Sequence, residues 1–216
     1  MERALQAICE GVLAGDRGAV EARVREALGL NVSAEDVLRQ GLIAAMTEVG
    51  ARFEAGEYYV PEMLVAANAM KAGMAVLKPR LAIEGVPALG TVVMGTVKGD
   101  LHDIGKNLVR MMLEGSGYQV IDLGVDVAPE KFALAARESQ AQIVGMSALL
   151  TTTMQSMKAA IEAIDDLGLR GQVKIIVGGA PVTQDYAEGI GADGYAPDAG
   201  AAVALTKTLL RETGKL

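Results

Sequence analysis

Cysteine, histidine and aromatic residues are scarce in this chain of 216 residues. There is one cysteine, Cys9, one histidine, His102, no tryptophan, and seven residues that are Phe or Tyr. A single cysteine excludes an intramolecular disulfide, which is typical of proteins in a reducing cytoplasm.

Long basic runs and long apolar runs are missing as well. The formal net charge is -7, which argues against nucleic acid or a membrane surface as a partner. Residues 1–15 lack the apolar core of a signal peptide, and no uninterrupted apolar run reaches the ~18 residues of a membrane span. About half of the chain is nevertheless hydrophobic, so a sizeable core is available. We expect a cytoplasmic protein.

Residues 1–85 carry the apolar spacing of helices only. The pattern predicts two helices separated at Gly15-Asp16, then a third helix capped by Ser33 that runs to about Phe53. Pro61 opens a fourth, since proline is favoured in the first turn of a helix. Four helices with short connections indicate an antiparallel bundle, and residues 86–90 are the expected linker that follows it.

Residues 91–216 alternate short apolar runs with helical segments. The expected strands lie at 91–94, 119–122, 143–146, 173–177 and 194–195. The helical patterns that follow them lie at 104–114, 129–139, 152–167, 185–189 and 200–212. Regular alternation of this kind predicts a doubly wound parallel sheet of five strands, covered by helices on both faces. Ligands of such domains bind beyond the carboxyl ends of the strands.

His102 lies in the segment 99–105, Gly-Asp-Leu-His-Asp-Ile-Gly, directly after the first expected strand. A neutral imidazole is a common metal ligand, and a carboxylate on its other nitrogen, here Asp100, fixes the ring. Gly105 would let a bulky ligand approach the backbone, and Asp103 is a candidate helix cap. An ordinary loop with a surface histidine remains equally open. Because the chain has no second histidine, a metal here must bring most of its ligands in a cofactor.

Three further segments follow expected elements, and each has an ordinary interpretation too. The hydroxyl-rich segment 147–153 is a helix-capping run or a pocket lining. Gly178-Gly179 is a tight turn or a flat backbone surface for a planar ring, and it is not part of a phosphate-binding fingerprint. The aromatic residues of segment 53–63 belong to the bundle core or cover a large apolar ligand.

Together these motifs resemble the cobalamin-binding module of corrinoid-dependent methyltransferases, over nearly the whole chain. The family pattern DxHxxG is met at Asp100, His102 and Gly105, SxL at Ser147 and Leu149, and GG at Gly178-Gly179. The resemblance extends to the stand-alone corrinoid proteins of methylamine, methanol and methoxy-aromatic systems, and to the matching module of methionine synthase. It implies a four-helix cap, residues 1–85, and a flavodoxin-like, Rossmann-type domain, residues 91–216.

The resemblance also implies a corrinoid bound base-off and His-on, with His102 as the cobalt ligand. Asp100 would hydrogen-bond to His102, and Thr153 stands where methionine synthase has the serine that completes this relay. The nucleotide tail would pass Ser147, Leu149 and the glycine pair, while Phe53 and Val60 of the cap, with Met63 nearby, would cover the upper face. The implied cofactor-binding residues are Gly99, Asp100, Leu101, His102, Asp103, Ile104, Gly105, Ser147, Leu149, Thr151, Thr153, Gly178, Gly179, Tyr195, Asp198, Ala199, Phe53, Val60 and Met63.

The function that the resemblance implies is that of a methyl carrier. Co(I) would accept a methyl group from a donor-specific methyltransferase, and methyl-Co(III) would deliver it to a tetrahydrofolate or coenzyme M methyltransferase; a reductive activation protein would be a third partner. Such a subunit is not a complete enzyme. The alternatives are a cobalamin sensor, the small subunit of an adenosylcobalamin mutase, and a flavodoxin-like domain without cobalamin. The acidic charge and the lack of a further domain disfavour the sensor, and segment 53–63 disfavours the mutase.

Overall fold

The structure, a computed structural model, describes residues 2–212, and their contacts divide them into two units. The first ends at Ala88 and includes Gly115–Gly117, and the second holds Leu89–Glu114 and the chain from Tyr118 onward. The division between Ala88 and Leu89 falls within segment 86–90, which the sequence analysis expects to be a linker. The last four residues of the expected second domain lie outside the described residues.

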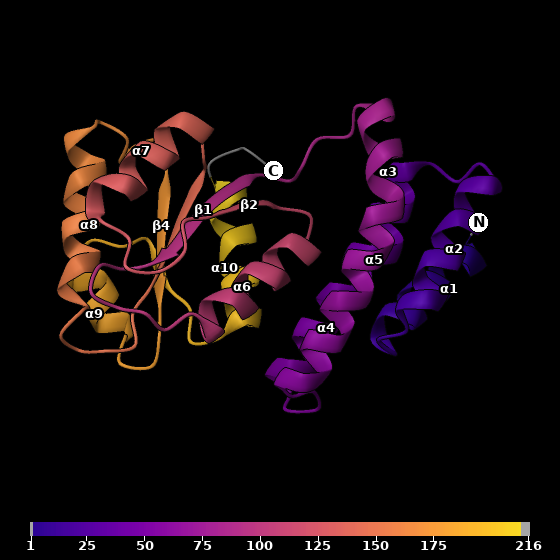
Figure 1. The fold of residues 1–216 in the computed structure, drawn as a ribbon, viewed down its shortest axis with the longest axis horizontal. Coiled ribbons are helices and arrows are strands. Elements are labelled where there is room, and N and C mark those ends of the chain that lie inside the picture. Colours follow the sequence, from indigo (N-terminus) through magenta and orange to yellow (C-terminus); the bar gives the residue numbers. More distant parts are fainter. Residues whose placement is uncertain (1, 213–216) are drawn as a thin grey trace. The chain divides into compact units, whose positions relative to one another are not determined.

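The first unit is entirely helical (Figure 1). It contains α1 (Glu2–Leu13), α2 (Arg17–Gly29), α3 (Ala34–Asp36), the π-helical segment η1 (Val37–Ile43), α4 (Ala44–Glu54) and α5 (Val60–Glu84). Gly15 has a positive φ of 68°, and the side chain of Asp16 caps α2 by accepting a hydrogen bond from the Ala19 amide at 2.9 Å. The chain therefore turns between α1 and α2 where the sequence predicts it.

The predicted third helix is present, but the first half of it is not a regular α-helix. Ser33 caps it as expected, accepting a hydrogen bond from the Asp36 amide at 3.0 Å, but residues Val37–Ile43 form π-helix rather than α-helix. Gly41 lies in this segment, and a Cβ there would meet the side chain of Ile8 at 3.2 Å. Apolar periodicity over seven residues does not distinguish the two helix types, so the sequence gives no sign of the change.

Helix α5 is long and apolar enough to cross a membrane by length and composition alone. The core helix of a water-soluble bundle passes the same test. Within the first unit α5 packs against α1, α2 and α4, and its side chains Met63, Met70 and Leu77 are buried. The packing of α5 is therefore that of a core helix.

The second unit is a five-stranded parallel sheet with the strand order β2-β1-β3-β4-β5. The strands are β1 (Thr91–Thr96), β2 (Gln119–Asp122), β3 (Ile143–Ser147), β4 (Lys174–Gly178) and β5 (Gly194–Tyr195). The helices are α6 (Ile104–Gly115), α7 (Pro129–Ser139), α8 (Gln155–Asp166), α9 (Gln184–Gly189) and α10 (Ala199–Glu212). This is the flavodoxin-like order, and the predicted fold class is confirmed.

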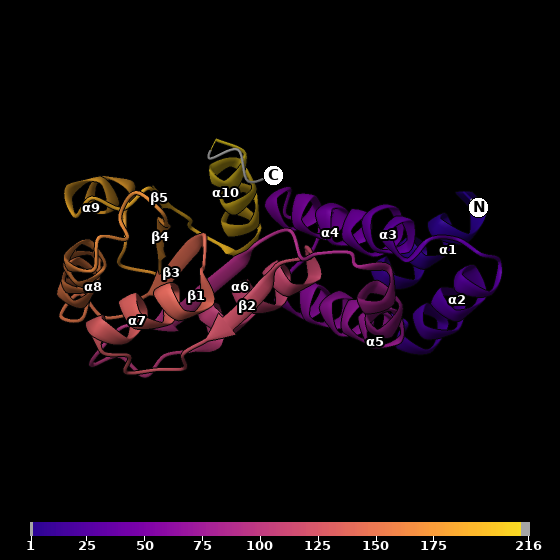
Figure 2. The ribbon, with the colours of Figure 1, turned by 90° about the horizontal axis from the view of Figure 1, so that it is seen from above.

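The two faces of the sheet are covered by different helices (Figures 1 and 2). One core cluster packs Phe132 of α7 and Met157 of α8 onto the sheet. The other packs Leu113 of α6 and Leu209 of α10 onto the opposite face. Because all five strands are parallel, the strand-to-helix loops gather at the carboxyl edge of the sheet, and the expected site residues of this unit belong to these loops and strand ends.

Several predicted boundaries in this unit differ from the structure by one or two residues, and the start of α8 differs by three. The sequence suggests a helix from Thr152, but residues 151–154 form turns and α8 begins at Gln155. The Thr153 hydroxyl lies 2.8 Å from both an Asp100 carboxylate oxygen and the Leu150 carbonyl oxygen. Serine and threonine side chains that bond locally compete with helix formation, which explains the later start.

Candidate functional site

His102 lies in the loop that leaves β1 and enters α6. Three of its polar atoms are held by the protein: the backbone N–H and Nδ1 lie 3.1 and 2.7 Å from Asp100 Oδ1, and its carbonyl accepts a hydrogen bond from Thr96 Oγ1 at 2.9 Å. The side chain is 52% exposed. Its remaining nitrogen, Nε2, makes no hydrogen bond with any residue between 2 and 212.

Asp100 is fully buried, and both of its oxygens accept hydrogen bonds. Oδ1 faces His102, while Oδ2 accepts from the amides of Leu149 at 2.8 Å and Leu150 at 3.3 Å and from Thr153 Oγ1 at 2.8 Å. Burial raises the pKa of Asp100, but the hydrogen bonds from Leu149, His102 and Thr153 outweigh it and hold the pKa well below the ordinary carboxyl range. Asp100 is therefore a carboxylate at neutral pH.

An ionised carboxylate can only accept hydrogen bonds. Because Asp100 Oδ1 lies 2.7 Å from His102 Nδ1, the imidazole proton must be on Nδ1. A neutral ring then has an unprotonated lone pair on Nε2, which is the form that binds a metal. The buried carboxylate thus fixes both the tautomer of His102 and the orientation of its ring.

Large apolar side chains stand exposed around His102. Leu101 is 70% exposed and Ile104 83%, both beside the histidine in sequence, and Leu149 and Leu150 donate their amides to Asp100 while their side chains are more than two-fifths exposed. Gly105 has no atom within 4 Å of the position that a Cβ would take. Exposed apolar patches mark binding surfaces, so the geometry fits a broad apolar ligand above Nε2.

The structure describes no protein cage for a metal ion in this region. No group of three or more His, Cys, Asp or Glu side chains that could hold a metal occurs among residues 2–212. The available protein ligand is one imidazole nitrogen. This donor set fits a metal whose other ligands come from a large planar cofactor such as a corrin ring.

The glycine pair after β4 allows a close approach of backbones. Gly179 has a φ of 127°, and a Cβ there would lie 1.9 Å from the Ala148 carbonyl oxygen. A Cβ on Gly178 would lie 2.8 Å from the Ala196 carbonyl oxygen. The Val182 amide donates to the Gly179 carbonyl at 2.9 Å, so the pair also forms a tight turn. Both interpretations of this motif are compatible with the structure.

Other expected site residues have structural partners. Gly99 has a positive φ of 83° and donates its amide to Asp126 Oδ1 at 2.7 Å. Asp103 Oδ2 accepts from the Asn107 side chain at 2.8 Å. Asp198 caps α10 by accepting from the Ala201 amide at 2.8 Å. Ala199 is buried, Thr151 is exposed, and Ser147 and Tyr195 are half-buried.

The expected cap residues belong to the first unit. Phe53 is half-buried in α4, Val60 is exposed at the start of α5, and Met63 is fully buried. The adjacent Tyr58 hydroxyl donates to the Leu13 carbonyl at 3.1 Å, which ties this connection to the bundle. That Phe53, Val60 and Met63 cover a cofactor stays a prediction.

Two features of the site were missed by the sequence analysis. Thr96 is buried at the end of β1 and contacts both His102 and Ser147. Lys106, in α6, is also buried, and its ammonium group lies 2.6 Å from Asp122 Oδ1 at the end of β2. A hydroxyl at the carboxyl end of a strand and a charged residue inside an apolar helix face are signals that could have indicated them.

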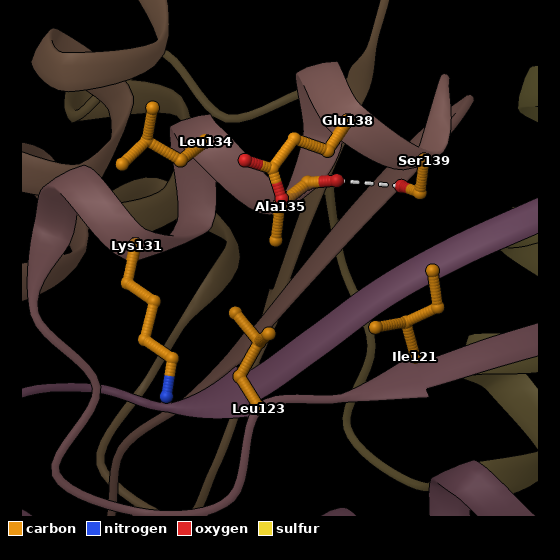
Figure 3. A pocket seen from close by; sticks show the side chains of 7 residues that line it. All are labelled: Ile121, Leu123, Lys131, Leu134, Ala135, Glu138 and Ser139. Carbon is orange, nitrogen blue, oxygen red and sulfur yellow. Dashed lines mark hydrogen bonds between the residues drawn. The ribbon is translucent and has the colours of Figure 1, made fainter.

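A separate groove lies between β2 and α7 and has a volume of about 500 Å³ (Figure 3). Ile121 and Leu123 form its floor, and five side chains of α7 line it: Lys131, Leu134, Ala135, Glu138 and Ser139. The Ser139 hydroxyl donates to the Ala135 carbonyl at 2.6 Å. None of the expected site residues lines this groove, so the chemistry is to be sought at His102.

Comparison with known proteins gives consistent results. Two models described as B12 binding domains match, one over residues 90–204 and one over residues 4–78. A dimethylamine corrinoid protein of Methanosarcina barkeri is 45% identical over 211 residues, covering 97% of this chain and 98% of the relative.

Solved structures agree. A cobalamin-binding protein of Desulfitobacterium hafniense DCB-2 is 33% identical with a TM-score of 0.80, covering 95% of this chain and 98% of that one. The methanol:cobalamin methyltransferase complex MtaBC of Methanosarcina barkeri contains a chain that is 27% identical with a TM-score of 0.84. The match covers 98% of this chain and 84% of that one.

The fold and the site thus define a cobalamin-binding protein, with a helical cap and a flavodoxin-like domain. More particularly, the chain belongs to the B12-binding corrinoid proteins of methyltransferase systems. The predicted resemblance is confirmed, and the cofactor is a corrinoid.

Proposed function

We propose that this protein is a methyl-carrying corrinoid subunit in which His102 Nε2 is the lower cobalt ligand, with the nucleotide base displaced. One observation carries the proposal: a half-exposed imidazole whose Nδ1 is protonated toward a buried carboxylate, with Nε2 free and apolar side chains exposed around it. The protein needs to supply only this nitrogen, since a corrin ring brings the equatorial ligands.

The bound corrinoid supplies a cobalt centre that accepts a methyl group and gives it up. The chain's own residues position and protect it. Asp100 keeps the proton of His102 on Nδ1, and Thr153 and the amides of Leu149 and Leu150 keep Asp100 ionised. Leu101 and Ile104 offer apolar surface beneath the ring, and Gly105 leaves room for its edge.

The tail of the cofactor is assigned to the segments after β3 and β4. Ser147, Leu149, Gly178 and Gly179 lie at the ends of these paired strands, where Ser147 and Gly178 are register partners. Tyr195 follows on the neighbouring strand β5. Parallel strands bring these ends to one edge, which supports a tail site beside His102.

The partners follow from this role. A carrier needs a methyltransferase that loads it, a tetrahydrofolate or coenzyme M methyltransferase that unloads it, and a reductive activation protein that restores inactive cobalt. We infer that the loading enzyme acts on a methylated amine, because a relative that is 45% identical over 97% of this chain is a dimethylamine corrinoid protein.

The histidine content makes a decisive experiment possible. Because His102 is the only histidine, growth on nitrogen-15 histidine labels a single imidazole. The protein is reconstituted with hydroxocobalamin and reduced to Co(II), and its electron paramagnetic resonance spectrum is recorded. We expect splitting by one axial nitrogen whose pattern changes with the label. A pattern insensitive to the label would refute ligation by His102, and no retained corrinoid would refute the carrier role.

Two variants complete this test. His102→Ala should retain the fold and lose the axial nitrogen splitting that responds to the label. Lys98→Ala is the matched control, because Lys98 is exposed in the same loop and its contact to Ser156 uses only its backbone carbonyl.

The methyl donor is then tested by incubation with isotopically labelled dimethylamine and a dimethylamine methyltransferase. Label retained by wild type and not by His102→Ala supports the assignment.

A further inference from the structure

Thr96 is the last residue of β1, and its backbone N–H and C=O groups are both hydrogen-bonded to the segment 124–127. Its amide donates to the Gly124 carbonyl at 2.9 Å, and its carbonyl accepts from the Val127 amide at 3.0 Å. The side chain has no exposed surface. Its hydroxyl oxygen lies 2.9 Å from the His102 carbonyl oxygen and 3.1 Å from Ser147 Oγ. Thr96 is therefore a rigid bridge between two loops at the carboxyl edge of the sheet.

The direction of these hydrogen bonds is determined. A hydroxyl carries one proton, and a carbonyl oxygen can only accept. Thr96 must therefore donate to the His102 carbonyl, which leaves its lone pairs to accept the proton of Ser147. The result is a directed series of hydrogen bonds from Ser147 through Thr96 to the backbone of His102.

This contact controls a degree of freedom that Asp100 does not. Asp100 Oδ1 holds the amide and the ring of His102 from one side. The peptide group that follows His102 is held by Thr96 from the other side. With both contacts made, the backbone torsions at His102 are fixed, and so is the position of Nε2 relative to the sheet.

We propose that Thr96 is a positioning residue that couples Ser147 to the imidazole of His102. The inference rests on the proposed ligation of cobalt by His102. Loss of the Thr96 hydroxyl releases the His102 carbonyl and leaves Ser147 without its acceptor. A displacement of Ser147 therefore reaches the backbone of His102 through the Thr96 hydroxyl, in addition to the path through the Leu149 amide and Asp100.

The test compares two substitutions, one that removes the hydroxyl and one that keeps it. Thr96→Val removes the hydroxyl and keeps the branched shape, while Thr96→Ser keeps the hydroxyl. In the protein without cofactor, we expect faster amide hydrogen exchange in the peptide spanning residues 99–106 for Thr96→Val, and wild-type exchange for Thr96→Ser. This readout requires no bound corrinoid.

With hydroxocobalamin bound, we expect about ten-fold weaker affinity for Thr96→Val, since one hydrogen bond is lost and a buried partner is left unsatisfied. Its Co(II) spectrum should show a reduced share of label-sensitive axial nitrogen. Thr96→Ser should bring the corrinoid affinity and the share of label-sensitive nitrogen to within about two-fold of wild type, because it retains the hydrogen bond. Rescue by serine separates positioning from a general loss of packing.

Ser147→Ala breaks the series at its other end and also carries the test if Thr96→Val is insoluble. In the protein without cofactor it should speed amide exchange in the peptide spanning residues 99–106 and add little to Thr96→Val, because coupled residues are not additive. Full additivity, or Thr96→Val with wild-type hydrogen exchange and nitrogen signal, would overturn the role of Thr96. Absence of the label-sensitive signal in wild type would instead overturn the proposed ligation, so the two failures are distinguishable.

Discussion

Replacing Asp100 by asparagine changes no volume but removes an acceptor. The carboxylate accepts from donors on both oxygens: two from His102 on Oδ1, and three from Leu149, Leu150 and Thr153 on Oδ2. An amide can satisfy only one of these sets with its oxygen. The backbone amides of Leu149 and Leu150 cannot reverse their polarity, so we expect the amide oxygen to face them and its NH₂ group to face His102.

That orientation has two consequences. The His102 amide loses its acceptor, and Nδ1 must become an acceptor, which moves the imidazole proton to Nε2. Hydrogen bonds to a charged group contribute about 1.5–3 kcal/mol and those between neutral groups about 1 kcal/mol, so we expect Asp100→Asn to lower the free energy of unfolding by about 3 kcal/mol. Thr153 keeps its acceptor, because the amide oxygen takes the place of Oδ2.

Urea unfolding of the protein without cofactor measures the stability term, and the Co(II) spectrum with labelled histidine measures the tautomer. A protonated Nε2 cannot bind cobalt, so the label-sensitive splitting should be lost although the imidazole is still present. Asp166→Asn is the matched control, because Asp166 is exposed at the end of α8 and is not one of the expected site residues. Asp100→Asn with wild-type splitting and an unfolding free energy within about 0.5 kcal/mol would refute this reasoning.

Three further outcomes are expected. Gly105→Ala should leave unfolding unchanged or slightly stabilised, because no atom lies within 4 Å, yet weaken corrinoid binding measured by absorbance titration; unchanged affinity would refute the assigned ring edge. Gly179→Ala should lower Tm or abolish soluble expression, since its Cβ would overlap a carbonyl oxygen at 1.9 Å; a wild-type Tm would contradict this. Lys106→Met should cost about 2 kcal/mol at neutral pH in urea unfolding, because Asp122 loses its partner at 2.6 Å and keeps the Gly124 amide and the more distant Arg110 guanidinium at 3.3 Å. Burial raises the pKa of Asp122, but the contact with Lys106 and its other partners lower it by more, so the net pKa lies below the ordinary value. The stabilisation is therefore present above the unfolded value of ~3.9 and is lost as pH falls. The difference between wild type and Lys106→Met should therefore shrink in acid, and a constant difference would refute the assigned pairing.

The second unit could be predicted closely because its signals are local. The runs at 119–122 and 194–195 are strands β2 and β5 with the predicted bounds, and 129–139 is helix α7. Short apolar runs between helical patterns leave few alternatives to a parallel sheet. The π-helical segment 37–43 could not be predicted, because its apolar positions also fit an α-helix.

The site was predictable where it is formed within one loop. Asp100 and His102 are two residues apart, so their contact can be inferred from the sequence. The contact of Thr153 with Asp100 came only through the family resemblance, and that of Thr96 with Ser147 was missed. Both depend on the register of β1 beside β3, in which Thr96 and Ser147 are partners at the strand ends. Hydrophobic patterning predicts that two strands exist but not which residues stand opposite each other.

That register explains how one histidine can be sufficient. A protein that binds a metal with several side chains fixes the ion by their number, whereas here a single nitrogen must be placed by its surroundings. The two loops are joined by Asp100 to Leu149 and by Thr96 to Ser147, one contact on each side of His102. Each contact is made between residues of the protein itself, and together they restrain the orientation of the imidazole. The entropic cost of ordering the His102 side chain is then met during folding and not on cofactor binding, which is how a preorganised site gains affinity without additional contacts.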